Sequence, residues 1–155
     1  MQTTTMIRGR DDGEATWFFN ALMTTKASTA ETAGAYSLTE HLVTAASNPP
    51  MHVQVEEDEA FYVLEGEIEL EVDGQVVLAT PGTFAFVARG AAHLFRVLTP
   101  TARMLVICSG KPTDNLEDFF LGMGEPATER VLPQPGPPDE ARLLALTART
   151  GIELV

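Results

Sequence analysis

Cysteine is almost absent from this chain of 155 residues. Cys108 is the only one, so no disulfide can form within the chain. A chain without disulfides is typical of a reducing compartment, and we therefore expect a cytoplasmic protein. Cys108 ends the apolar run 104–108. That position predicts a buried core residue rather than a reactive thiol.

Positive charge and long apolar runs are also scarce. The chain has ten lysines and arginines against 22 aspartates and glutamates, which gives a net charge of −12 and a pI near 4.5. Such an acidic surface repels phosphate backbones and anionic lipid, so we expect no nucleic acid and no membrane as partners. No run is long enough to span a bilayer, and we see no signal-peptide core near the N-terminus.

Short alternating segments are plentiful. Residues 67–72 alternate apolar and acidic side chains, which is typical of a strand with one face in the core and one in water. Asp73 and Gly74 follow, and this pair favours a tight hairpin turn because both residues tolerate positive φ. The predicted strands cover residues 16–19, 22–25, 36–43, 60–64, 67–72, 75–79, 84–87, 93–98 and 102–109. This pattern predicts an all-β fold, an antiparallel barrel or double-sheet roll of six or more strands.

The composition changes after the last predicted strand. Residues 114–122 are predicted to be helical, with Asp114 as N-cap and Glu117 as its capping-box partner. Residues 139–149 are predicted to form a second short helix, with Gly151 as its C-cap.

The pattern of segments also suggests a domain division. Between the helices, residues 125–138 are rich in proline and glycine and read as an extended linker. We therefore expect a β-barrel domain at 1–111, with residues 1–14 as an N-terminal arm. A C-terminal helical extension at 112–155 would pack on the barrel.

Four residues in the middle of the chain carry side chains that bind metals. His52 and Gln54 are two apart in an extended segment and therefore point the same way. Glu59 opens the next predicted strand and His93 begins a later one. Inward faces of a closed sheet bring such distant residues together. Two histidines and a carboxylate are the donor set of open iron(II) sites, and zinc or manganese would also accept it. Gln54 either adds an amide oxygen or orients a bound water or substrate.

These residues also carry a resemblance to the cupin family, in its short single-domain form. The positions in register with the two family motifs are His52, Gln54, Glu59 and Gly66, then Gly82, Ala88, Gly90, His93 and Val97. The stretches 49–52 and 57–67 are especially similar to quercetin dioxygenase-like cupins, and 117–120 and 135–138 resemble that group's C-terminal extension. The resemblance implies a cupin-type β-barrel, or double-sheet jelly roll. It also implies one divalent metal ion (Fe, Ni, Mn, Cu or Zn) bound by His52, Gln54, Glu59 and His93.

The sequence departs from the family motifs at three positions. Gln54 replaces a histidine that is usually a ligand, Val97 replaces an asparagine, and Ala88 replaces a proline. Glutamine is a metal ligand in some sugar-isomerase cupins, so a site that contains Gln54 is chemically reasonable. Val97 removes a polar group and makes the nearby pocket drier.

Strand parity with the metal-binding residues predicts an apolar pocket beside the metal. Its predicted lining residues are Met51, Phe61, Val63, Phe95 and Val97. Such a pocket suits a flat aromatic or enolisable small molecule that binds the metal through oxygen.

Three nearby residues fall outside the motifs. We expect His41 to be a half-exposed strand residue. Glu40 shares a strand face with Tyr36 and Leu38, and it is a candidate general base if that face is inward. Tyr62 lies on the opposite strand face from Glu59, which favours packing over catalysis.

Three functions are compatible with this sequence. The first is a dioxygenase-like metal-dependent enzyme with Glu59 and Gln54 as catalytic residues. The second is a redox-neutral cupin, such as a polyketide cyclase, isomerase or lyase, with the metal as Lewis acid, and Gln54 adds weight to it. The third is a non-catalytic cupin that binds a small ligand.

We also expect a homodimer. Small cupin-like barrels leave strand edges and an apolar outer sheet face uncovered. Trp17, Phe18 and Phe19 could cover such a face in a neighbouring copy.

Overall fold

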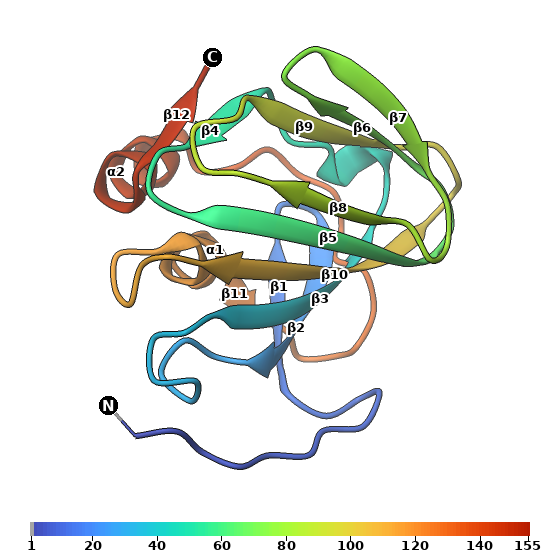
Figure 1. The fold of residues 1–155 in the computed structure, drawn as a ribbon. Helices are drawn as coiled ribbons and strands as arrows, with labels where there is room; N and C mark the ends of the chain where they lie inside the picture. The colour runs from blue at the N-terminus through green and yellow to red at the C-terminus, as the bar shows by residue number, and fades with distance from the viewer. Residues whose placement is uncertain (1) are drawn as a thin grey trace.

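The computed structural model describes residues 2–155 and consists mainly of two antiparallel sheets (Figure 1). The seven-stranded sheet has the order β11-β1-β2-β3-β10-β5-β8. Its strands are β1 (Glu14–Phe18), β2 (Ala21–Ala27), β3 (Ser37–Val43), β5 (Asp58–Glu65), β8 (Phe84–Val87), β10 (Ala102–Ser109) and β11 (Glu125–Pro126). The five-stranded sheet has the order β12-β4-β9-β6-β7. Its strands are β4 (His52–Gln54), β6 (Ile68–Val72), β7 (Gln75–Ala79), β9 (His93–Val97) and β12 (Ile152–Leu154). The predicted all-β double-sheet fold is confirmed.

Alternating side chains of both sheets form a single core. Ile68 and Leu70 of β6 are buried as predicted, and they share this core with Val63 of β5. Cys108 is also buried there, again as predicted, and burial raises the pKa of its thiol well above the ordinary value. The hairpin between β6 and β7 turns at Asp73 and Gly74, which both have positive φ.

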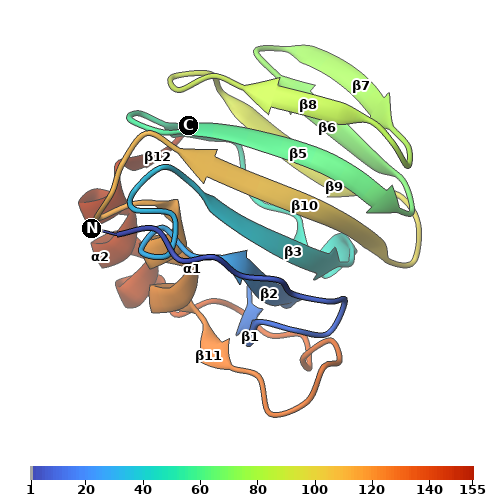
Figure 2. The ribbon, with the colours of Figure 1, turned by 60° about the horizontal axis from the view of Figure 1, so that its bottom comes forward.

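Two short helices lie together at one side of the sheets (Figure 2). They are α1 (Leu116–Met123) and α2 (Glu140–Thr150). Asp139 caps α2 through the backbone N–H of Arg142, and Gly151 ends that helix in the left-handed conformation, both as expected.

The predicted N-cap of the first helix was wrong by one residue. Asn115, not Asp114, caps α1, and its side chain accepts a hydrogen bond from the backbone N–H of Asp118 at 2.9 Å. Asp114 has a φ of 50°, whereas an N-cap residue is extended. Glu117, the expected capping partner, is instead buried and accepts a hydrogen bond from the backbone N–H of Thr29.

The chain after residue 111 contributes to both sheets. β11 pairs with β1 in one sheet, and β12 pairs with β4 in the other. Between β11 and α2, residues 127–139 form no helix or strand, and the indole of Trp17 donates a hydrogen bond to Val131 in this stretch. At the other end, residues 2–13 of the predicted arm form no helix or strand, and residue 1 lies outside the described residues.

Candidate metal centre and pocket

Three potential metal donors meet where β4, β5 and β9 come together. His52 and His93 are direct cross-strand partners in the antiparallel pair β4–β9. Glu59 is the second residue of β5 in the facing sheet. The nearest donor atoms of the three side chains all lie within 4.8 Å of one another. The sequence prediction that these residues converge is confirmed.

Backbone carbonyls hold both imidazoles in a suitable orientation. Nδ1 of His52 lies 2.9 Å from the carbonyl oxygen of Pro50, and Nδ1 of His93 lies 2.9 Å from that of Ala91. When each Nδ1–H donates to its carbonyl, the Nε2 of each neutral ring has a lone pair available for a metal. Histidines that bind metals typically donate their second N–H in this way. The residues present therefore fit a divalent metal by donor type and orientation.

Glu59 is the centre of the hydrogen-bond network in this cluster. Its Oε2 accepts a hydrogen bond from Nε2 of Gln54 at 2.8 Å and lies 2.9 Å from Nε2 of His93. Glu59, Gln54 and His93 are all buried, and His52 is partly buried. Gln54 therefore contacts the carboxylate directly, and its role toward a metal stays a prediction.

The pKa values of the cluster reflect burial and mutual charge. Burial opposes the charged form of Glu59, but the hydrogen bond and charge of His93 outweigh it and hold the Glu59 pKa below its usual value. Burial likewise opposes a charged His93, but Glu59 raises its pKa above the usual value. Burial and the charge of His93 lower the pKa of His52. Because metal ligands must be deprotonated, a bound metal would displace the proton that His93 and Glu59 share.

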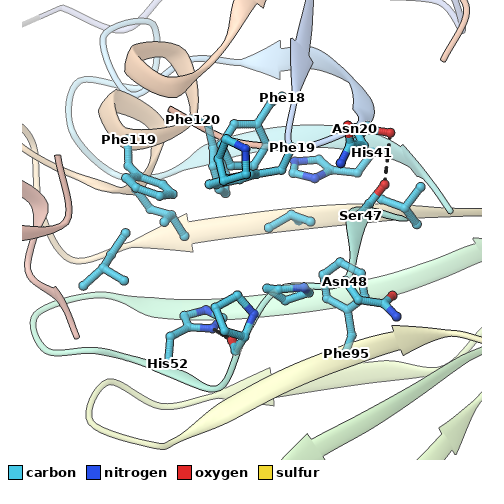
Figure 3. A pocket seen from close by; sticks show the side chains of 18 of the residues that line it. Phe18, Phe19, Asn20, His41, Ser47, Asn48, His52, Phe95, Phe119 and Phe120 are labelled. Carbon is cyan, nitrogen blue, oxygen red and sulfur yellow. Dashed lines mark hydrogen bonds between the residues drawn. The ribbon is translucent and has the colours of Figure 1, made fainter. Parts of the chain in front are cut away.

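A cavity of about 310 Å³ extends from this cluster through the space between the sheets. Its wall is mainly aromatic and includes Phe18, Phe19, Phe61, Phe95, Phe119 and Phe120. Figure 3 shows His52 and Phe95 on one side of this space and His41 with Phe18 and Phe120 on the other. The cavity therefore has a lining that suits an apolar aromatic molecule.

The predicted pocket residues are only partly those that line the cavity. Phe61 and Phe95 line it, whereas Met51, Val63 and Val97 do not belong to its lining. Val63 and Val97 are on inward faces, as strand parity requires, but they are packed in the hydrophobic core. Parity selects a face of a strand, and it does not tell how far along the barrel the open space extends.

Segments outside the motifs close the cavity, and sequence reasoning missed them. Phe18 and Phe19 come from the hairpin between β1 and β2, and Phe119 and Phe120 come from α1. The rings of Phe18 and Phe120 lie 4.8 Å apart. The two Phe-Phe pairs were a visible signal in the sequence. Only the fold shows that they face the same space.

The prediction for His41 was wrong. Its side chain is not half-exposed but buried, at 5% exposure, and it lines the cavity. The inward face of β3 is the one that His41 shares with Ser37 and Thr39, and both of these residues are buried too. Burial lowers the pKa of His41 to about 4, with the charge of Glu59 as a smaller opposing effect.

Glu40 and Tyr62 lie away from the cavity. Glu40 points to the other face of β3, where its carboxylate pairs with Arg103. It does not line the cavity, so the conditional role as general base does not apply. Tyr62 is 40% exposed on the outer face of β5, consistent with a side chain that does not belong to the site.

Comparison with known proteins agrees with this geometry. A family model described as a cupin domain matches residues 39–109, the stretch that supplies His52, Glu59 and His93. These residues form a cupin domain. A quercetin 2,3-dioxygenase of Bacillus subtilis (strain 168) is 32% identical over 76 residues, which cover 48% of this chain and 21% of that protein. This chain therefore matches only about a fifth of the length of that relative.

Solved structures share the fold of this chain. The polyketide cyclase RemF from Streptomyces resistomycificus is 28% identical, with a TM-score of 0.57 over 68% of this chain and 79% of that one. A predicted oxalate decarboxylase from Thermotoga maritima has a TM-score of 0.61 over 68% of this chain and 99% of that one. At 18% identity, the latter likeness concerns the fold alone. Across residues 2–155, we find no helix with the length and apolar character of a membrane span.

Proposed function

We propose that this cupin is a metal-dependent enzyme that acts on a small aromatic or enolisable molecule, with a dioxygenase-like reaction as the first expectation. The observation that carries the proposal is the convergence of His52, Glu59 and His93 at one end of an aromatic cavity. Backbone carbonyls take the Nδ1–H of both imidazoles, so both Nε2 atoms are directed at the same space as Glu59 and can bind a metal once the proton between His93 and Glu59 is lost.

The residues of the site suggest a division of tasks. His52, Glu59 and His93 would hold the metal, and the metal would supply Lewis acidity to a substrate oxygen. Glu59 is a carboxylate at neutral pH and is placed to take a proton from a substrate hydroxyl or acidic carbon. Gln54 donates to Glu59 and thereby fixes the orientation of that carboxylate. The aromatic wall orients a flat substrate and excludes water from it.

The likeness to quercetin 2,3-dioxygenase supports the dioxygenase-like reaction, and it covers 76 residues of this chain. A redox-neutral reaction, such as ring closure, is the second candidate. It is favoured by Gln54, which replaces a histidine of the family motif with an amide that is a weaker donor to late transition metals. The likeness to a polyketide cyclase agrees with this second candidate.

Metal content tests the site directly. We expect about one divalent ion per chain, measured by elemental analysis of protein purified without a metal-affinity tag. His93→Ala should lose this ion on dialysis, because two donors remain. His41→Phe is the matched control, since it alters the chain's third histidine outside the donor cluster, and it should keep the ion. Equal metal occupancy in wild type, His52→Ala and His93→Ala would contradict the proposal.

Oxygen uptake separates the two reactions. With quercetin as the probe, a dioxygenase-like enzyme consumes dioxygen in step with loss of the flavonol, and Glu59→Gln and His93→Ala abolish both. Conversion of an enolisable polyketide under anaerobic conditions would support the redox-neutral candidate instead. Binding without conversion of either probe would leave the protein as a ligand-binding cupin and would contradict an enzymatic role.

A further inference from the structure

The cavity has a second polar group away from the metal donors. His41 lies with Phe18 and Phe120 on the side of the cavity that faces His52 and Phe95 (Figure 3). Its ring is 6.5 Å from that of Phe18 and 5.3 Å from that of Phe120, centre to centre. An imidazole in such apolar surroundings is costly to bury unless both ring nitrogens find partners.

Only one of these nitrogens has a partner among residues 2–155. Nε2 of His41 lies 2.9 Å from the hydroxyl of Thr39, and the structure gives Nδ1 no hydrogen bond to any group of residues 2–155. Two side-chain polar atoms of that part of the chain are fully enclosed without partners, and Nδ1 of His41 is not one of them. Because His41 lines the cavity, its free nitrogen is accessible from the cavity.

Other polar side chains of the wall have partners or face solvent. Asn48 accepts a hydrogen bond from the N–H of Val97 and is otherwise exposed. Asn20 donates to the carbonyl of Ala46 and accepts from the N–H of Gly136. The hydroxyl of Thr147 donates within its own helix. His41 therefore differs from these residues, since its unused group is available to a molecule in the cavity.

The hydrogen bonds around Thr39 indicate which role this nitrogen has. The Thr39 hydroxyl has a single proton, and the carbonyl oxygen of Val106 lies within 3.5 Å of it. When Thr39 donates to Val106, its oxygen accepts the Nε2–H of His41. Nδ1 of the neutral ring is then an acceptor, and its natural partner in an apolar cavity is an O–H group.

We propose that Nδ1 of His41 accepts a hydrogen bond from a hydroxyl of the bound molecule. The pocket then selects a flat aromatic compound with a metal-binding oxygen at one end and a phenolic or enolic O–H at the other. The inference about the metal-binding end of this ligand rests on the proposed function. The inference about the end at His41 depends only on the geometry of the cavity.

A pair of naphthols tests the proposal. Naphthalene-2,6-diol carries a hydroxyl at both ends, and 6-methoxy-2-naphthol keeps one hydroxyl but cannot donate from the other end. By calorimetry, we expect the wild-type protein to bind the diol about tenfold more tightly than the methoxy compound, as for the loss of one hydrogen bond to a buried acceptor. In His41→Phe, which keeps an aromatic ring but has no acceptor, the two dissociation constants should become equal.

Two further variants keep the test decisive. His41→Asn places an amide near the position of Nδ1 and should retain part of the preference for the diol, even if His41→Phe folds poorly. Phe95→Leu alters the wall without a polar change. It should therefore weaken the binding of both compounds equally and leave the ratio of their dissociation constants unchanged. A ratio near one in the wild type, or an unchanged ratio in His41→Phe, would overturn the proposal.

Metal analysis of the same samples separates this inference from the proposed function. A normal metal content without a preference for the diol would refute the role of His41 alone. A preference that depends on His41 in a protein without metal would refute the metal centre and leave the role of His41 standing.

Discussion

The three histidines of this chain differ because their surroundings differ. His52 and His93 have their Nδ1 atoms on backbone carbonyls and their other nitrogens near Glu59. His41 has a hydroxyl on one nitrogen and an apolar cavity at the other. Residue type alone therefore does not give the role, which depends on what each ring nitrogen contacts.

Gln54 gives the first prediction at this scale. Gln54→Ala should either lose the metal, if the amide is a direct ligand, or keep the metal and lose turnover, if the amide acts only by holding Glu59. From the hydrogen bond between Gln54 and Glu59 we expect the second outcome. Gln54→His should retain metal and bind it more tightly, because imidazole is a better donor than an amide. Metal content and turnover measured together check both variants, and loss of metal in Gln54→His would contradict the expectation.

His41 gives a prediction for pH. Its pKa is about 4 in the folded protein, because burial disfavours the charged form, against an ordinary value of 6.5. Between these values the unfolded chain binds a proton that the folded protein does not, so His41 destabilises the fold as the pH falls from 6.5 towards 4. The slope is at most about 1.4 kcal/mol per pH unit.

Urea unfolding at pH 7, 6 and 5 checks this prediction. Wild type should lose more free energy of unfolding over this range than His41→Phe, in which the group is absent. The other titrating groups, including His93 and Glu59, are common to both proteins and cancel in the comparison. Parallel pH profiles would show that His41 titrates normally in the folded state.

At the scale of elements, two turns between strands contain glycine for different physical reasons. Gly66 links β5 to β6 with a φ of 77°, and a side chain there would meet the carbonyl oxygen of Thr101 at 2.5 Å. Gly74, in the hairpin between β6 and β7, has a similar φ of 80° but no neighbouring atom within 4 Å. Both positions need positive φ, and only Gly66 also needs the absence of a Cβ.

Alanine at these two glycines should therefore have unequal costs. Gly74→Ala should lower the free energy of unfolding by about 1–2 kcal/mol, the cost of a left-handed conformation for a non-glycine residue. Gly66→Ala should cost about 1–3 kcal/mol more, because backbone atoms must also move to admit the methyl group. Denaturant unfolding of the two variants measures the difference, and equal costs would show that the turn at Gly66 can relax.

At the scale of the whole molecule, apolar side chains are exposed on two edge strands. Val77 of β7 and Phe84 and Phe86 of β8 are each more than half exposed. Each of these strands is one of the two edge strands of its sheet, and β7 lies on the side of the molecule away from the helices (Figure 2). Exposed apolar edge strands favour association with another chain.

Trp17, Phe18 and Phe19, which the sequence suggested as dimer contacts, make contacts within their own chain. Phe18 lies in the core of its own chain, and Phe19 lines the cavity. The indole N–H of Trp17 donates a hydrogen bond to the carbonyl oxygen of Val131 in the same chain. The homodimer stays a prediction, and we now assign its contact to β7 and β8.

Light scattering tests the dimer. We expect the wild-type protein at micromolar concentration to have twice the chain mass of 16.7 kDa. The double change Phe84→Glu and Phe86→Glu should give the single-chain mass, because burying two added charges is costly. Leu144→Glu, on the exposed face of α2, is the matched control and should stay dimeric. A wild-type mass of 16.7 kDa would rule out this dimer.

Local patterns in the sequence were enough for most strands of the two sheets and for the candidate metal donors. They did not predict β11 and β12, which form by pairing with the distant strands β1 and β4. The alternation in β6 and the Asp73-Gly74 turn depend on neighbouring residues, so they could be predicted from order alone. The spacing of His52, Glu59 and His93 likewise matched a motif whose geometry the barrel reproduces.

Tertiary structure decided what local order left open. Alternation shows that His41 and Glu40 lie on opposite faces of β3, but it does not tell which face is inside. That choice depends on packing against β2, β10 and α1, which are distant in sequence. The closure of the cavity by Phe18 and Phe120 has the same cause. Contacts between distant segments depend on the total apolar area that the whole fold buries. The sequence of a single strand does not determine that area.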